Sequence, residues 1–171
     1  MSRVLVVGMV FMGLAGMTAQ AAAPAAPKPC SGPEYHQFDF FVGDWIATKK
    51  DGTPAGTLLM TVEEGGCLLH EHWEGAGGTN GQSLNFYDKN DRRWHQVWVD
   101  NEGNWLNLSG TLVGKSMNFT ATTTGPGGKR QLLRAGFVDN GDGTAREWYD
   151  TSDDNGKSWQ PQFDATFTRK K

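Results

Sequence analysis

Residues 68–100 read LLHEHWEGAGGTNGQSLNFYDKNDRRWHQVWVD. Three stretches of this segment, 68–74, 82–88 and 93–100, alternate apolar or aromatic residues with polar ones, as half-buried strands do. Clusters of turn-forming residues separate the stretches, at Gly77-Gly78, Asn80-Gly81 and Asp88 to Asp91. The segment therefore predicts three consecutive strands joined by short turns.

The same strand-and-turn pattern extends over most of the chain. Twenty-three glycines and seven tryptophans fit short strands with tight turns and large interior side chains. Ten strands at this spacing favour an all-β fold, a single antiparallel up-and-down barrel that closes to remove its edge strands. Residues 33–41 are predicted to form a short helical turn that plugs one end. The other seven strands are predicted at 44–50, 57–64, 104–110, 115–121, 130–138, 144–151 and 159–169.

Residues 1–21 match a bacterial secretory signal peptide. Arg3 supplies a short positive region, and Val4 to Met17 form an apolar run that is too short to span a bilayer comfortably. Ala19-Gln20-Ala21 fits the small-x-small pattern at which such peptides are cleaved. An uncleaved membrane anchor is the alternative. Cleavage would leave two parts, a flexible Ala- and Pro-rich leader at 22–33 and one barrel domain at 34–171.

The signal peptide predicts export, so we expect a periplasmic or secreted protein with no membrane span after signal cleavage. The chain has two cysteines, Cys30 and Cys67. Because export places them in an oxidising compartment, a disulfide between them is predicted. The alternative is two free thiols, with Cys67 at a Gly-Gly-Cys turn.

Composition and motifs exclude several classes of function. The net charge of −3 and the lack of a basic cluster give no footprint for nucleic acid. The chain contains no G-x-S-x-G, C-x-x-C or H-E-x-x-H sequence, so the common nucleophilic and zinc motifs are missing. No motif identifies a cofactor. These observations favour a role other than catalysis.

A resemblance to known proteins begins at Phe38-Asp39-Phe40-Phe41-Val42-Gly43-Asp44-Trp45. The Gly-x-Trp at the start of the first strand resembles the opening of lipocalin-like (calycin) barrels, in which the Trp closes the base. The stretch is also similar to the F-D-F-W-x-G-x-W motif of a group of uncharacterised secreted bacterial proteins, with Phe41 in place of a Trp. The resemblance implies a ligand-holding barrel and no defined activity. It continues at Gly66-Cys67, Glu71-x-Trp73, Asn85 to Asp88 and Trp94 to Asp100.

Residues 152–159, SDDNGKSW, follow the pattern S-x-D-x-G-x-[ST]-W and resemble the Asp-box hairpin of sialidases and other β proteins. In that hairpin the Asp side chain holds backbone amides of the turn, the Gly adopts a positive φ and the Trp packs beneath. The resemblance implies a structural turn. Carbohydrate chemistry is not expected, because no pair of inward-facing carboxylates is identified.

Side-chain alternation predicts which residues face the interior, if the tryptophan-bearing face of each strand points inward. Aromatic walls with a few polar groups are typical of small-molecule pockets. The alternative is a filled barrel in which the polar groups satisfy one another. A buried Glu71 needs Arg146 or another partner, or has a raised pKa. The predicted ligand-binding residues are Glu71, Trp73, Asn85, Tyr87, Trp94, Gln96, Trp98, Arg146 and Trp148.

His70-x-His72-x-Glu74 places two imidazoles and a carboxylate on one face of a strand, which some zinc sites also do. His95 is another candidate ligand, on a later strand. Alternating polar residues also mark the solvated face of an ordinary strand. No metal site is predicted, and a site formed by His70, His72 and Glu74 stays the alternative.

Three classes of function remain from the sequence. The first is a barrel that binds or carries a small apolar or aromatic ligand, such as a haem-like molecule. The second is an enzyme in which Glu71 acts as a general acid or base in the same cavity. The third is an envelope interaction or structural protein with a filled barrel.

Overall fold

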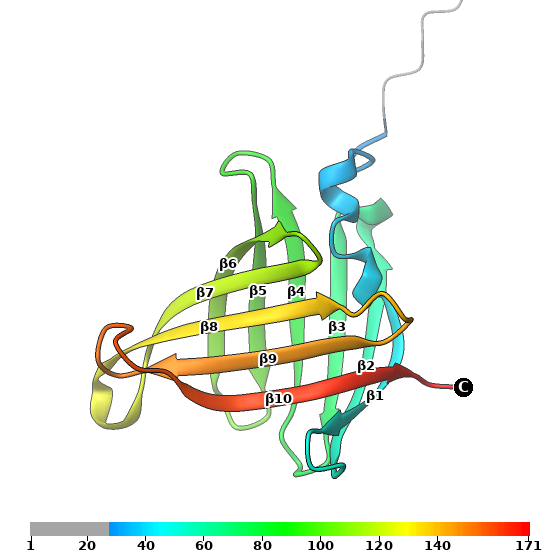
Figure 1. The fold of residues 1–171 in the computed structure, drawn as a ribbon. Helices are drawn as coiled ribbons and strands as arrows, with labels where there is room; N and C mark the ends of the chain where they lie inside the picture. The colour runs from blue at the N-terminus through cyan, green and yellow to red at the C-terminus, as the bar shows by residue number, and fades with distance from the viewer. Residues whose placement is uncertain (1–27) are drawn as a thin grey trace, which may run out of the picture.

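A computed structural model describes residues 28–171. The predicted signal peptide, 1–21, and the first part of the predicted leader lie outside the described residues. Ten strands follow one another along the described chain (Figure 1). They are β1 (Gly43–Lys49), β2 (Pro54–Glu63), β3 (Leu68–Gly75), β4 (Asn80–Asp88), β5 (Arg93–Asp100), β6 (Trp105–Val113), β7 (Ser116–Thr124), β8 (Arg130–Asp139), β9 (Ala145–Ser152) and β10 (Gln160–Arg169).

The strands form one closed antiparallel barrel. Each strand pairs with its neighbours in sequence, and β1 pairs with β10 to complete the ring. In Figure 1, β7 to β10 cross in front of β2 to β6 at a steep angle. The predicted ten-strand up-and-down barrel is confirmed. The largest differences from the predicted bounds are at β2, which begins at Pro54, at β6, which ends at Val113, and at β7, which ends at Thr124.

Two short 3₁₀ helices close one end of the barrel. They are η1 (Pro33–His36) and η2 (Asp39–Phe41), which confirm the predicted helical turn. We call residues 33–41 the plug. Its neighbours lie where β4 ends and β5 begins, since Tyr35 contacts Tyr87 edge to face with ring centroids 5.3 Å apart. We call this end of the barrel the closed end and the opposite one the open end.

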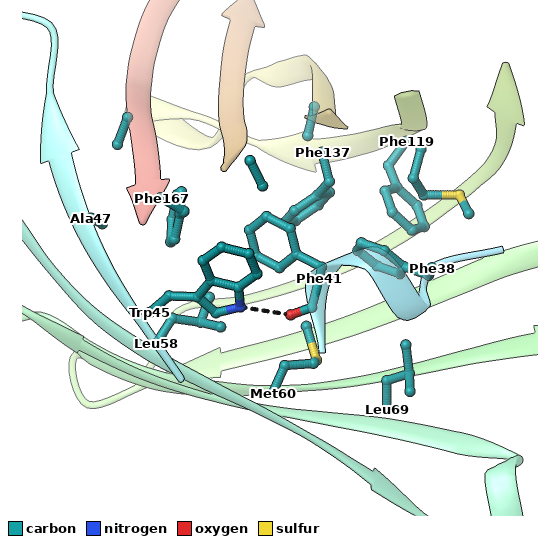
Figure 2. Packing of buried hydrophobic residues seen from close by; sticks show 14 of the residues in the cluster. Phe38, Phe41, Trp45, Ala47, Leu58, Met60, Leu69, Phe119, Phe137 and Phe167 are labelled. Carbon is teal, nitrogen blue, oxygen red and sulfur yellow. Dashed lines mark hydrogen bonds between the residues drawn. The ribbon is translucent and has the colours of Figure 1, made fainter. Parts of the chain in front are cut away.

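Aromatic side chains of the plug fill the closed half of the lumen. Phe38 and Phe41 are fully buried, and Figure 2 shows them among side chains of the surrounding strands. The Phe41 ring stacks on Trp45 with centroids 5.6 Å apart, and the Trp45 indole N–H donates to the Phe41 carbonyl at 2.9 Å. The Arg169 guanidinium lies 3.7 Å from the centre of the Trp45 ring. Trp45 therefore helps to close the base of the barrel.

Cys30 and Cys67 form the predicted disulfide. Cys67 directly follows the 3₁₀ turn η3 (Glu64–Gly66), which joins β2 to β3 at the closed end. The bridge therefore ties the chain just before the plug to the rim of the barrel that the plug fills. Within residues 28–171, no helix is long and apolar enough to cross a membrane.

Candidate functional site

The open half of the lumen contains a cavity of about 320 Å³. Four aromatic side chains form much of its wall: Trp73 on β3, Trp98 on β5, Tyr149 on β9 and Phe163 on β10. Phe163 meets Trp73 edge to face at 5.8 Å and stacks on Tyr149 at 6.0 Å, so three of the four rings hold one another in place. Other lining residues include Glu71, Gln96, Leu106, Leu108, Leu133, Phe137 and Glu147.

Glu71 lies in the middle of β3 and is only 4% exposed. Its Oε2 atom accepts hydrogen bonds from the Ser83 hydroxyl at 2.5 Å and from the Gln96 amide at 3.4 Å. Ser83 is directly opposite Glu71 in the pairing of β3 with β4, and Gln96 lies on the next strand, β5. The other carboxylate oxygen, Oε1, has no hydrogen-bond partner among residues 28–171.

Glu147 on β9 is a second carboxyl group that lines the cavity. Within the described chain it makes no hydrogen bond or ion pair. The Glu147 side chain is partly exposed, and because it lines the lumen, its exposed surface faces the cavity. Burial raises the pKa of Glu147 well above its ordinary value, and the charge of Glu71 raises it further.

Both carboxyl groups have pKa values above the ordinary value of a glutamate. Burial raises the pKa of Glu71 to about 7, although the hydrogen bonds from Ser83 and Gln96 act in the opposite direction. Interacting acids of this kind titrate as a pair, and one of them stays protonated while the other ionises. The cavity thus offers both a hydrogen-bond donor and charged acceptors.

Four of the nine predicted ligand-binding residues line the cavity. They are Glu71, Trp73, Gln96 and Trp98. The predicted inward faces of β3 and β5 are therefore correct, because every second side chain of a strand points into the barrel.

Three more predicted residues lie inside the barrel, closer to the plug, and do not line the cavity. Asn85 is fully buried and donates to Ser83 at 2.8 Å and to the Leu69 carbonyl at 3.3 Å. Trp94 donates to the Gln37 side chain at 3.3 Å, and Tyr87 packs against Tyr35 of the plug. These residues belong to the core of the closed half.

The prediction that Arg146 and Trp148 face the lumen is wrong. Their neighbours on β9, Glu147 and Tyr149, line the cavity, so Arg146 and Trp148 point outward. Arg146 makes a bidentate ion pair with Asp164 of β10, with both N–O distances at 2.7 Å. Glu71 therefore has Ser83 and Gln96 as partners, and the anticipated contact with Arg146 does not form.

Outward placement of Trp148 depends on a glycine on the neighbouring strand. Gly136 of β8 pairs with Trp148, and a Cβ atom at Gly136 would lie 2.5 Å from the indole nitrogen. The indole thus covers bare backbone on the outside of the barrel. Arg134 stacks 5.7 Å from the Trp148 ring and 4.3 Å from the Trp159 ring, which completes an outer cation–π cluster.

Glu147 and Tyr149 are site residues that the sequence interpretation missed. Each face of β9 carries an aromatic and a charged residue, so the position of the tryptophan did not indicate which face points inward. A usable signal was the set of opposite charges on Arg134, Asp150, Arg146 and Asp164, which pair across neighbouring strands on the outer face. The expectation that no inward carboxylate pair exists is also wrong, since Glu71 and Glu147 both line the cavity.

The Asp-box residues form the β9–β10 turn at the open end. Asp154 accepts from the Ser158 backbone amide at 2.9 Å and from the Ser158 hydroxyl at 2.6 Å, and these bonds lower its pKa to about 2. Gly156 has φ of +85°. The carboxylate is engaged by its own turn, so it acts as a structural group.

His70 and His72 lie on the outer face of β3, away from the cavity, with ring centroids 4.2 Å apart. His70 contacts Gln82 at 2.9 Å and Glu63 at 3.2 Å, and Glu74 is exposed. In the described part of the chain, the donor atoms that come together as metal ligands do are those of Asp88, Asp91 and His95. Asp91 already pairs with His95 at 2.8 Å.

Neither a protein-family model nor a curated protein matches the chain. The geometry of the cavity is therefore the basis for assigning a function.

Replacing Glu71 with glutamine is expected to flatten the pH dependence of stability. An unfolded chain ionises Glu71 near 4.5 and the folded protein does so at about 7, so the folded protein binds more protons between these values. The free energy of unfolding therefore falls as pH rises through this window, by about 3 kcal/mol for Glu71. Urea unfolding of wild type and Glu71→Gln across this pH range measures the difference.

Glu74→Gln is the matched control, because Glu74 is on the same strand and is exposed. It should keep the wild-type slope. Equal slopes in wild type and Glu71→Gln would show that Glu71 is not a desolvated acid in the folded protein.

Proposed function

We propose that this protein binds a small ligand with an apolar or aromatic body in the open half of its barrel. The observation that carries the proposal is the cavity of about 320 Å³ with aromatic walls and two carboxyl groups. Pockets for small molecules combine mostly apolar linings with a few polar groups that orient the ligand. A cavity of this kind argues against the filled-barrel alternative.

The walls leave apolar surface that a ligand would cover. Trp73, Trp98, Tyr149 and Phe163 are each only partly buried, although they belong to the lumen. Covering such surface is favourable by about 25 cal/mol per Å². Because contacts between the rings already hold three of them in place, little conformational entropy is lost when a ligand binds.

Access to the cavity is through the open end. Trp98, Leu106, Leu133 and Tyr149 line both the cavity and a wider hollow of about 1240 Å³. Strands β6, β7 and β8 supply much of the hollow's wall, and β9 and β10 add to it. Trp105, which also lines the hollow, is 66% exposed.

The proposed location is the periplasm or the cell exterior. Residues 1–21 have the features of a signal peptide, and the Cys30–Cys67 disulfide suits an oxidising compartment. The similarity to lipocalin-like barrels and to the secreted F-D-F-W-x-G-x-W group stays a prediction. It supports the same kind of role.

The carboxyl pair also favours a second candidate, general acid–base catalysis on a bound substrate. One protonated and one ionised carboxyl group at neutral pH can donate and accept a proton at the same ligand. Glu71→Gln would then abolish turnover while leaving binding intact. A variant with full activity would exclude this role for Glu71.

Native mass spectrometry tests the proposal most directly. The protein isolated from a bacterial periplasm should carry a mass excess that denaturation removes, and the denatured chain should be lighter by two protons because of the disulfide. The excess gives the mass of the ligand. Protein that shows no excess and binds no apolar probe would overturn the proposed function.

Replacing Trp98 with alanine is expected to weaken ligand binding about tenfold or more, since large aromatic contacts carry much of the binding free energy. The neutral fluorescent probe N-phenylnaphthylamine reports binding as an increase in emission. Trp148→Ala is the matched control, because Trp148 points outward. If both variants bind the probe as wild type does, the lumen is not the binding site.

A further inference from the structure

We propose, resting on the proposed function, that the ligand carries a cationic nitrogen on its apolar or aromatic body. The class includes primary amines, guanidines and quaternary ammonium compounds. Three observations on residues 28–171 support this inference: carboxyl oxygens without partners, no basic side chain paired with them, and the aromatic walls around them.

The cavity contains carboxyl oxygens that have no hydrogen-bond partner in the described chain. Glu71 is more than nine-tenths buried, lines the cavity and has no hydrogen-bond partner at Oε1 in the described chain. Neither oxygen of Glu147 has one. The donors of Ser83 and Gln96 are already engaged with Glu71. An ammonium group supplies the donors that these acceptors lack.

No basic side chain within the described residues neutralises the two carboxyl groups. Lys49 is the cationic residue of the lining, and it is exposed at the last position of β1, at the open end. Arg146 and Arg134 lie on the outer face, where they pair with Asp164 and Asp150. A cation brought by the ligand would therefore favour the ionised forms of the two carboxyl groups with no basic side chain among residues 28–171 competing for them, whereas an anion would oppose their ionisation.

The aromatic walls suit a cation as well as an apolar body. Trp73, Trp98, Tyr149 and Phe163 line the same cavity as Glu71 and Glu147. Cations bind over the faces of such rings, and tryptophan is the strongest of them in this respect. The interaction between a cation and a ring is stronger when both are removed from water, as they are in the interior of the barrel.

Protons should be released when a cation binds. The groups that face the pair are Ser83, Gln96 and Tyr149, with His70 behind Glu71 on the outer face. Burial holds protons on the empty pair, and a bound cation favours the ionised forms. Affinity for a cation should therefore rise as pH rises through about 7, the pKa of Glu71.

Three probes of matched shape test the inference. Phenethylamine is cationic, propylbenzene is its neutral isostere, and hydrocinnamate is the corresponding anion. Calorimetric titration of the wild-type protein should give an affinity for phenethylamine that is about tenfold or more above that for propylbenzene, and no binding of hydrocinnamate. Titration in buffers of different ionisation enthalpy should show proton release with phenethylamine alone.

The double variant Glu71→Gln, Glu147→Gln should lose the preference for phenethylamine and keep its affinity for propylbenzene. Glutamine preserves the shape of the side chain, so the cavity and its hydrogen bonds remain. Glu74→Gln, on the outer face of β3, is the control and should bind all three probes as wild type does.

The outcomes separate this inference from the proposed function. Equal binding of phenethylamine and propylbenzene would overturn the cationic ligand and leave the lumen as a binding site. The same holds if no probe binds while native mass spectrometry still finds a ligand that is not cationic. Absence of both probe binding and a co-purified ligand would overturn the two proposals together.

Discussion

Replacing Phe41 with alanine is expected to lower the free energy of unfolding by about 4 kcal/mol, the middle of the range for a buried phenylalanine. Phe41 is fully buried, and its ring lies 5.1 Å from Phe167, 5.2 Å from Phe137 and 5.6 Å from Trp45, measured between centroids. Strands cannot collapse into the space it leaves, because the barrel is a closed ring of hydrogen bonds. Urea unfolding followed by tryptophan fluorescence measures the loss.

Phe40 is the matched control for this experiment. It is the neighbouring residue of the plug and is only partly buried, so alanine at this position should cost clearly less. If both variants are as stable as wild type, the plug would not be part of the cooperative core, and the closed end would be looser than its contacts indicate.

Removal of the Cys30–Cys67 disulfide should also cost about 4 kcal/mol in the chain-entropy account. The bridge joins residues separated by 37 positions, and it constrains a loop that includes the plug, β1 and β2. Its loss leaves the folded contacts in place and gives the unfolded chain more freedom. Unfolding of the double variant Cys30→Ala, Cys67→Ala against oxidised wild type measures the effect.

Reductant provides the internal control, since it should destabilise wild type and leave the double variant unchanged. Equal stability of oxidised protein and double variant would show that the bridge contributes nothing to folding. A large effect would mean that the protein reaches its full stability only in an oxidising compartment, which agrees with the proposed export.

The strands could be predicted because local patterns and tertiary structure agree along most of the chain. On β5, Trp94, Gln96 and Trp98 alternate with His95, Val97 and Val99, and the first set is the inward one. Turn-forming glycines and asparagines end each strand without help from distant residues. An up-and-down order follows, since such short turns join only antiparallel neighbours.

The site was predictable only in part, for reasons visible on β9. Alternation states that Arg146 and Trp148 share one face, but it does not state which face is inward. The direction depends on Asp164 and Gly136, which lie on the neighbouring strands and make the outer face the better place for a guanidinium and an indole.

The all-β class, the ten strands in up-and-down order, the plug and the disulfide were all predicted from the sequence. The first three depend on period-two alternation and turn residues within short segments, and the disulfide prediction depends on the even cysteine count and the predicted export. The placement of Glu147 and Glu71 at one cavity was not predictable from local sequence. The two residues are far apart in the chain, and only closure of the barrel places both side chains in the same lumen. Their raised pKa values follow from that shared burial, because neither carboxyl group is desolvated until the ring of strands is complete.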